Sequence, residues 1–393
     1  MKNKVPKLRF PEFSGEWEEK KFREIVKINQ GLQIAISERY DSDGVNRYFY
    51  ITNEFLKKNS EKKYYIENPP ESVLCKDDDI LMTRTGNTGQ VVTGVNGAFH
   101  NNFFKIKYDK VITDKRFLYY TLTSNKIQNM IIKLAGASTI PDLNHGDFYK
   151  IKSSYPLLPE QEKIASFLSE VDIKIEKLEK KKELLSQYKK GMMQKLFSQK
   201  LRFKDESGND YPEWEEKRLG EICSFFSGGT PKSTEKRFYQ GDIPFIGSGN
   251  ISDSFAEKFI TEEALNSSSS KLVKKGDLLY ALYGATSGEV ALSKIAGAIN
   301  QAVLCIRSCE NIVFIYNFFK LNKRVILDTY LQGGQGNLSA QIIKELEINL
   351  PSLPEQEKIA NFLSTIDEKI ELVKEESEKN KEFKKGLLQQ MFV

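Results

Sequence analysis

The sequence predicts a mixed α+β protein, in which two globular domains are joined by a pair of long antiparallel coiled-coil helices with pseudo-twofold symmetry. Three observations support this fold class. The chain has 393 residues, which is too long for one ordinary core and suits two to three domains. A segment with a helical hydrophobic pattern occurs twice. The stretches that precede its two copies differ in sequence and mix β-type runs with glycine-containing loops.

The composition is typical of a folded protein that does not span a membrane. Hydrophobic residues make up 39% of the chain, with 25 Phe and 17 Tyr, which is enough for packed interiors. The longest apolar run, 312–319, is far shorter than the ~20 residues that cross a bilayer, and no apolar segment follows the lysine-rich start. We therefore expect a soluble, cytoplasmic protein. The net charge of +5 permits a nucleic-acid partner, although an ordinary lysine-rich surface explains it equally well.

Cysteine and histidine do not indicate a disulfide framework or a metal site. There are four cysteines and two histidines in the whole chain. Cys305 and Cys309 are four residues apart, which does not match the CxxC spacing of common zinc sites. We expect no metal and no cofactor in this chain.

The repeat determines the predicted organisation. Residues 156–197 align with residues 351–392 without a gap, and about half of the positions are identical. A shorter repeat, Glu-Trp-Glu-Glu-Lys, starts at Glu16 and at Glu213, and each copy follows a Leu-Arg-Phe triplet. The predicted segments are a first globular domain, a first helix, a second globular domain and a second helix, at 1–155, 156–200, 201–350 and 351–393.

Hydrophobic periodicity predicts that the repeated segments are helices. Alternate steps of four and three residues from Ile164 reach mostly apolar residues as far as Leu196. The same steps from Ile359 to Met391 cross a polar middle. Each segment begins at a proline followed by glutamates, which suits a helix start. An amphipathic helix lying on its own domain is the alternative, but ~38 helical residues would extend roughly 57 Å, more than the diameter of such a domain.

Connectivity predicts that the two helices are antiparallel. Each globular domain precedes the N-terminus of its own helix, and the second domain must also follow the C-terminus of the first helix. A parallel pair would need a long linker after Phe197, and the short segment 204–210 is a poor candidate. The first helix carries more lysines than acids and the second more acids than lysines, so the two suit one another electrostatically.

Within the globular domains, local patterns indicate short strands and helices. The β-rich runs are 91–93, 103–108 and 303–307, and helical patterns cover 114–133 and 312–322. The topology of the domains does not follow from these patterns.

The duplicated Pro-x-Leu-Pro-Glu-Gln-Glu-Lys-Ile-Ala motif at Pro156 and Pro351, with the Glu-Trp-Glu motif before each half, resembles the specificity subunits of type I restriction-modification systems. The resemblance covers the whole chain. It implies that each globular domain is a target-recognition domain reading one half of a split, asymmetric site in double-stranded DNA, and that the helices set the spacing. It also implies two modification subunits, which bind S-adenosylmethionine and methylate adenine, and restriction subunits that use ATP and Mg²⁺. This chain would then be non-catalytic.

Two alternatives remain at this point. A coiled-coil scaffold that binds only proteins would share the helix pattern, and an autonomous nuclease could use Asp142, Asp172 and Lys174 as a carboxylate and lysine set. The Asn68-Pro69-Pro70 sequence is similar to a methyltransferase motif, but it lacks the aromatic residue that stacks on the flipped base.

Candidate DNA-reading residues lie in polar loops, because Arg, Asn and Gln carry the donors and acceptors that distinguish base edges in the major groove. For any single residue, a polar turn exposed to water is an equally good interpretation. The candidates in the first domain are Arg84, Thr85, Asn87, Thr88, Gln90, Ser138, Thr139 and Asn144. Those in the second domain are Tyr283, Thr286, Ser287, Gln332, Gln335 and Asn337.

The C-terminal ends of the two repeated helices carry more apolar side chains than one partner helix needs. They are candidate docking points for the modification subunits, and capping of the helix pair against the globular domains is the alternative. The residues are Met192, Met193, Leu196, Phe197, Leu387, Leu388, Met391 and Phe392.

Overall fold

A computed structural model describes residues 4–57, 60, 62–136, 139–331 and 338–393, which form two compact units. Unit 1 contains the chain up to Glu179 together with Glu375–Val393, and unit 2 contains Lys180–Lys374. The divisions fall inside the two long helices, because each globular domain packs on the adjacent parts of both. The predicted α+β class is confirmed.

Unit 1 is built on three small sheets. The two-stranded sheet pairs β1 (Glu18–Lys21) with β10 (Lys152–Tyr155). An antiparallel sheet has the order β2 (Val26–Gln30), β9 (Phe103–Tyr108), β6 (Ile80–Thr83) and β7 (Val91–Val92). The other sheet has the order β4 (Tyr65–Glu67), β3 (Arg47–Ile51), β8 (Gly97–Phe99) and β5 (Leu74–Cys75), and only its β3–β8 pair is parallel.

Helices complete unit 1. They are α1 (Phe22–Ile25), α2 (Lys115–Thr123), α3 (Asn125–Ala135), α4 (His145–Lys150), the first part of α5 (Leu158–Phe197) and three 3₁₀ turns, η1 (Ile36–Glu38), η2 (Asn53–Leu56) and η3 (Glu71–Val73). The helical pattern predicted for 114–133 is confirmed, but the helix is divided at Ser124. The Ser124 side chain accepts a hydrogen bond from the amide of Ile127 and so begins a new helix.

Unit 2 repeats this topology strand for strand. Its sheets are β11 (Glu215–Arg218) with β20 (Glu347–Leu350); β12 (Cys223–Ser227), β19 (Val303–Ser308), β16 (Leu278–Ala281) and β17 (Val290–Leu292); and β14 (Phe259–Ile260), β13 (Ile243–Ile246), β18 (Gly297–Ile299) and β15 (Lys271–Val273). Again only one strand pair, β13–β18, is parallel. The two domains therefore share one fold although their sequences diverge.

The helices of unit 2 follow a similar chain order. They are α6 (Leu219–Ile222), α7 (Glu262–Asn266), α8 (Ile312–Tyr330), α9 (Ala340–Glu345), most of α10 (Leu353–Met391), and the 3₁₀ turns η4 (Lys236–Tyr239) and η5 (Ser248–Asn250). A single helix, α8, lies between β19 and α9 where unit 1 has α2 and α3. Helix α8 extends beyond the predicted 312–322. No helix in the described parts of the chain is both long enough and apolar enough to cross a membrane.

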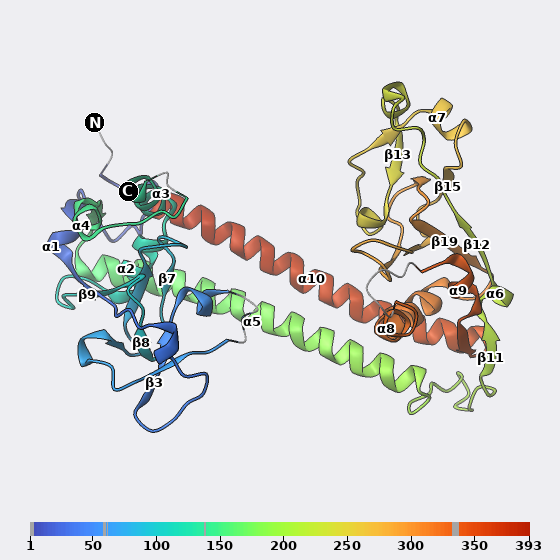
Figure 1. The fold of residues 1–393 in the computed structure, drawn as a ribbon, viewed down its shortest axis with the longest axis horizontal. Helices are drawn as coiled ribbons and strands as arrows, with labels where there is room; N and C mark the ends of the chain where they lie inside the picture. Colours follow the sequence, from blue (N-terminus) through green and yellow to red (C-terminus); the bar gives the residue numbers. More distant parts are fainter. Residues whose placement is uncertain (1–3, 58–59, 61, 137–138, 332–337) are drawn as a thin grey trace. The chain divides into compact units, whose positions relative to one another are not determined.

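The two repeated segments form single helices of 40 and 39 residues, as the periodicity predicted. Figure 1 shows α5 and α10 side by side. Within unit 1, Asp172 of α5 contacts Lys384 of α10, and within unit 2, Lys189 of α5 contacts Asp367 of α10. Residue numbers rise along one helix as they fall along the other, so the antiparallel prediction is confirmed.

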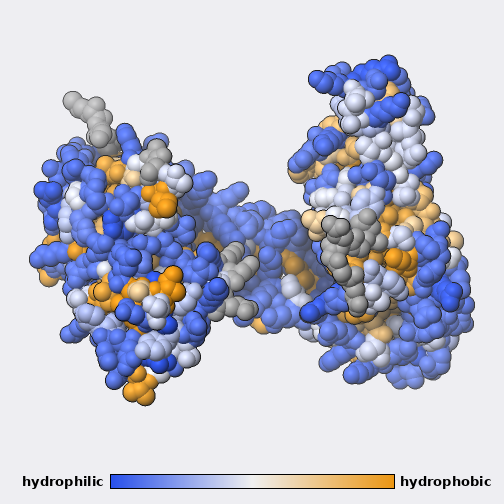
Figure 2. Space-filling model, in the orientation of Figure 1, coloured by the Kyte–Doolittle hydropathy of each residue, from blue (hydrophilic) through white to orange (hydrophobic). Residues whose placement is uncertain are grey.

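The predicted hydrophobic seam is buried between the helices. Apolar side chains from Ile164 to Leu178 in α5 and from Ile359 to Val373 in α10 carry most of it. The visible face of the helices is mostly hydrophilic (Figure 2), although the helices also expose Leu184, Leu372 and Phe383. The polar middle of the second copy is also buried: Ser377 is 1% exposed and donates a hydrogen bond of 2.7 Å to Glu179.

The repeated motifs form a buried junction at the start of each long helix. In unit 1, the carboxylate of Glu160 accepts hydrogen bonds from Arg9 and from the indole of Trp17. In unit 2, Glu355 accepts the same bonds from Arg202 and Trp214. The Leu-Arg-Phe, Glu-Trp-Glu and Pro-Glu-Gln motifs therefore recur because together they hold a domain on its helix.

Candidate functional site

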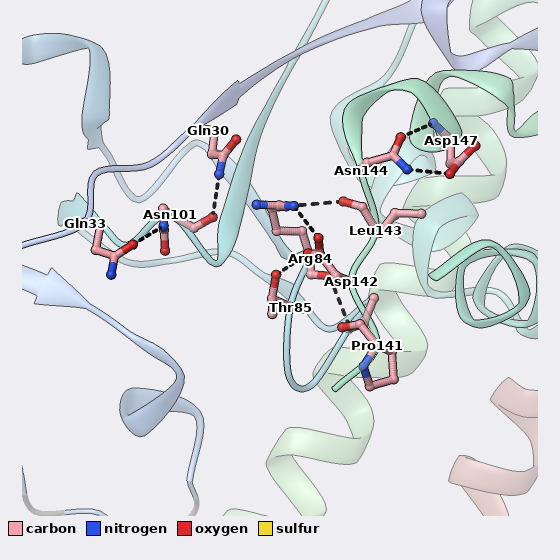
Figure 3. Close-up of polar contacts among 11 residues, drawn as sticks. Gln30, Gln33, Arg84, Thr85, Asn101, Pro141, Asp142, Leu143, Asn144 and Asp147 are labelled. Atoms are coloured by element: carbon pink, nitrogen blue, oxygen red, sulfur yellow. Dashed lines mark hydrogen bonds and ion pairs between the residues drawn. The ribbon is translucent and has the colours of Figure 1, made fainter. Parts of the chain in front are cut away.

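Two of the predicted loops in unit 1 meet at one edge of the domain (Figure 3). The loop after β6 begins at Arg84, and Thr85 pairs with Asp142 in an isolated β-bridge. The amide of Leu143 donates a 2.8 Å hydrogen bond to the carbonyl oxygen of Arg84. The structure thus brings together segments that lie almost 60 residues apart in the sequence.

Arg84, which was predicted to read guanine, ties these two loops together. Nη2 donates to Asp142 Oδ2 at 2.7 Å, and Nε donates to the carbonyl oxygen of Leu143 at 3.2 Å. The side chain is 16% exposed, and its guanidinium lies over the Phe104 ring. Two of the guanidinium's N–H donors are therefore used inside the protein, on a side chain that is mostly buried.

Three other predicted residues in unit 1 are also engaged locally. Thr85 Oγ1 donates to Asp142 Oδ1, and Thr88 Oγ1 donates to the carbonyl oxygen of Pro141 at 2.8 Å. Asn144 caps α4, since its Oδ1 accepts a hydrogen bond from the amide of Asp147. These side chains shape the loops.

The structure describes three of the four remaining candidates in unit 1. Asn87, Gln90 and Thr139 are exposed, so they remain candidates for contact with a ligand. Ser138 lies outside the described residues.

The equivalent edge of unit 2 has the same backbone contacts but different side chains. The amide of Leu338 donates to the carbonyl oxygen of Leu282 at 3.1 Å, as Leu143 does to Arg84. The buried Leu282 therefore occupies the position of Arg84. Ser287 Oγ donates to the Leu282 carbonyl at 3.0 Å, in the role of Thr88.

Of the predicted residues in unit 2, Tyr283 and Thr286 are half-buried. Tyr283 packs against the core, and burial raises the pKa of its phenol. Gln332, Gln335 and Asn337 lie outside the described residues.

A polar pair that the sequence reasoning missed lies beside these loops in each unit. In unit 1, Asn101 Nδ2 donates to Gln33 Oε1 at 2.8 Å (Figure 3). In unit 2, Thr230 Oγ1 donates to Gln301 Oε1 at 2.6 Å. In unit 1 the pair joins the segment after β2 to the turn between β8 and β9. In unit 2 it joins the segment after β12 to the turn between β18 and β19. The similar sequences Gly-Ala-Phe-His-Asn at 97–101 and Gly-Ala-Ile-Asn-Gln at 297–301 were the signal that could have revealed them.

The turn that carries Asn101 is stabilised by a neutral histidine. Burial, together with the nearby charge of Arg39, lowers the pKa of His100 to about 4. His100 Nδ1 accepts a hydrogen bond from the amide of Asn102. In unit 2, Asn300 Oδ1 accepts the same bond from the amide of Ala302. Two different side chains therefore hold one turn geometry.

Most of the apolar side chains proposed as docking points are used inside their own units. Met193 and Leu196 belong to the core of unit 2, and Leu387 and Met391 belong to the core of unit 1. These four side chains are buried, so the expectation that they face another subunit is corrected for them: they attach the helix ends to the globular domains.

The other four proposed docking residues are partly buried. Phe197 stacks on Phe314, and Phe392 stacks on Phe117. Met192 and Leu388 are half-buried and keep some surface that a partner could contact.

The alternative carboxylate and lysine set does not assemble. Asp142 is bound by Arg84 and Thr85, whereas Asp172 accepts a hydrogen bond from Tyr120 and pairs with Lys384. Among the described residues, no group of three or more His, Cys, Asp or Glu side chains could hold a metal ion.

Comparison with known proteins agrees with the duplicated architecture. Residues 14–186 and 211–381 each match the family described as the type I restriction modification DNA specificity domain. The specificity subunit of the type I restriction enzyme MjaVIII from Methanocaldococcus jannaschii is 27% identical over 97% of this chain and 92% of its own. The EcoR124I/EcoR124II specificity subunit of Escherichia coli is 28% identical over 39% of this chain and 41% of its own.

Solved structures share the fold. The S subunit of a type I restriction-modification system from M. genitalium aligns over 99% of both chains, with a TM-score of 0.63 and 20% sequence identity. A chain from a structure on complex assembly and conformational transition of the type I system aligns over 95% of this chain and 97% of its own, with a TM-score of 0.54 and 17% identity. With two family domains that cover most of its length, this chain belongs to the family of type I restriction-modification DNA specificity subunits.

Proposed function

We propose that this chain reads a bipartite, gapped and asymmetric DNA site and directs the adenine-methylating and restricting subunits of a type I complex to it. Unit 1 would read one half-site and unit 2 the other. The observation that carries the proposal is the duplicated fold with unlike side chains at equivalent positions of the loop edge. The exposed Gln33 is matched by Thr230, and Asn101 by the exposed Gln301. Equal scaffolds with unequal surfaces suit a reader of two unlike half-sites.

The long helices support a spacing role. A helix of 40 residues is about 60 Å long, and one turn of DNA advances about 34–36 Å. A helix pair of this length would be sufficient to place two readers one helical turn apart or a little more. The unspecified bases of the site would lie between them.

Catalysis would belong to partner subunits. Two modification subunits would bind S-adenosylmethionine, and restriction subunits would use ATP and Mg²⁺. This chain would contribute sequence selection only. The engagement of Asp142 and Asp172 in structural bonds is in accord with that division.

Long-read methylation mapping of DNA treated with the chain and its modification subunits tests the proposal. We expect a single motif of two short specified parts separated by a fixed gap. Replacing residues 1–150 with the corresponding domain of a relative should change one part of the motif and leave the other unaltered. Methylation without a gapped motif, or a change in both parts, would contradict the proposal. A complex without salt-dependent DNA affinity would favour the protein-only scaffold.

A further inference from the structure

The polar pairs Gln33–Asn101 and Thr230–Gln301 occupy equivalent places in the two units. Gly31 follows β2, and a Cβ atom on it would collide with the carbonyl oxygens of Phe99 and His100. Gly228 follows β12, and a Cβ atom there would collide with the carbonyl oxygen of Ile299. In both units a glycine lets this segment pass closely over the turn that follows β8 or β18. The side chains of segment and turn then meet at the surface.

The two pairs have the same hydrogen-bonding pattern, but the glutamine and the residue that donates to it have exchanged places. In unit 1 the exposed glutamine, Gln33, comes from the segment, and Asn101 of the turn donates to it. In unit 2 the exposed glutamine, Gln301, comes from the turn, and Thr230 of the segment donates to it. Each unit therefore presents one exposed glutamine whose Oε1 accepts a hydrogen bond from a neighbouring side chain.

This pattern orients the amide group of each glutamine. Oε1 accepts the internal bond, and Nε2 of each exposed glutamine makes no hydrogen bond to any residue that the structure describes. A carbonyl oxygen has a second lone pair. One donor and one acceptor thus remain on the same planar group, which is the combination that binds N7 and the N6 amino group of adenine in the major groove.

Two further observations indicate a binding role. The Oδ1 atom of Asn101 is buried without a hydrogen-bond partner among the described residues, which is unfavourable for folding. Stability alone would not favour an asparagine here, whereas orientation of Gln33 requires its Nδ2 donor. In unit 2, Thr230 lines a surface hollow of about 610 Å³ together with Ser233, Lys258 and Asn300, and Glu257 and the rings of Tyr239, Phe245 and Phe259 complete the lining. The hydroxyl, amide and ammonium groups of this hollow are donors of the kind that bond to phosphate and sugar oxygens.

We propose that Gln33 and Gln301 each read an adenine of an A·T pair, one in each half-site, and that Asn101 and Thr230 are the positioning residues that orient them. The inference rests on the proposed function. It adds that the two unlike half-sites share one required A·T pair, read from the same place in each domain.

The test begins with the motif of the wild-type complex, mapped with its modification subunits by long-read sequencing. Competition binding then uses the cognate duplex and duplexes with one substituted base pair. In Gln301→Ala, discrimination at one adenine of one half-site should fall from about 5- to 150-fold to almost none. Gln33→Ala should do the same in the other half-site, and Gln389→Ala, an exposed glutamine on α10, should change neither.

The positioning role has its own readout. Thr230→Val keeps the shape of the side chain but removes the donor, so it should weaken discrimination at the base pair affected by Gln301→Ala. The double variant should equal Gln301→Ala alone, since both changes act on one contact.

The outcomes are distinguishable. A wild-type complex without a gapped motif overturns the proposed function itself. A gapped motif that Gln33→Ala and Gln301→Ala leave unchanged overturns only the adenine-reading inference. A uniform loss of affinity for all duplexes, with the thermal unfolding profile unchanged, also overturns it, because it would indicate phosphate contact instead of base reading.

Discussion

Lys189 Nζ of α5 lies 2.7 Å from Oδ1 and 2.6 Å from Oδ2 of Asp367 of α10. The same pair occurs in unit 1 with the helices exchanged, where Lys384 of α10 lies 2.5 Å from Asp172 of α5. The repeat thus encodes one ion pair that is used twice. In unit 1 it is extended, because the buried Tyr120 donates a 2.7 Å hydrogen bond to Asp172.

Removal of the Lys384–Asp172 pair should lower the stability of the chain more than removal of the Lys189–Asp367 pair. Asp172→Ala leaves Lys384 without its carboxylate and the buried Tyr120 with only the longer bond to Ser169, so we expect a loss of about 2–3 kcal/mol in the free energy of unfolding. Asp367→Ala should cost about 1 kcal/mol, because that carboxylate is 46% exposed and its attraction is screened by water. Urea unfolding of the full chain measures both. Tyr120→Phe is the matched control, and equal losses for the two aspartate variants would contradict this account.

Arg84 should act on the stability of unit 1 more than on base preference. Arg84→Leu copies the residue found at the equivalent position of unit 2, Leu282, and removes the bonds to Asp142 and Leu143. We expect unit 1 to lose about 1–3 kcal/mol of stability and DNA affinity to fall by a similar factor for all duplexes. Thermal unfolding and competition binding check this. Selective relaxation at one guanine would instead restore Arg84 as a base reader.

The sequence predicted the parts of the fold that depend on local pattern and on repetition. The helices that contain Ile164 and Ile359 were predictable because their apolar residues recur with helical spacing. Their antiparallel pairing followed from connectivity. The sheet order could not be predicted, since it depends on contacts between strands far apart in the chain, such as β2 and β9.

The site was less predictable for the same physical reason. A polar loop residue such as Arg84 can bond either to DNA or to its own backbone, and the sequence does not distinguish the two. The Gln33–Asn101 pair joins residues 68 positions apart, and only the close passage at Gly31 brings them together. The apolar helix ends were recognised as unusual, but whether Leu196 faces a partner or its own core depends on tertiary packing.

His100 should make unit 1 sensitive to mild acid. Its pKa is about 4 in the folded chain and about 6.5 in an unfolded one, so between these values the unfolded state binds the additional proton. The stability of unit 1 should therefore fall as the pH is lowered from about 6.5 to about 4. His100→Asn copies Asn300, which accepts the equivalent backbone bond without titrating in this range.

Thermal unfolding as a function of pH compares the wild type with His100→Asn. The difference in melting temperature between the wild type and His100→Asn should grow, in favour of the variant, as the pH falls through this window. Parallel pH profiles would show that His100 does not carry the effect. The wild type and the variant have the same carboxylates, so the effect of carboxylate titration cancels in the difference between their melting temperatures.

The helix pair should determine the gap of the DNA motif through its length. Because the seam is antiparallel, an insertion must be made in both helices: seven residues with two apolar seam positions after Leu178 of α5, and a matching segment after Ser377 of α10. Seven helical residues add about 10 Å, which corresponds to about three base pairs of DNA. Methylation mapping should show a gap longer by about three base pairs and unchanged specified parts.

An insertion outside the helices provides the control for this prediction. Seven flexible residues after Gly208, in the exposed turn that separates α5 from β11, add chain length without lengthening the helix pair. The motif of that variant should equal the wild-type motif. A longer gap in the control, or an unchanged gap in the helix variant, would show that the paired helices do not set the distance between the two readers.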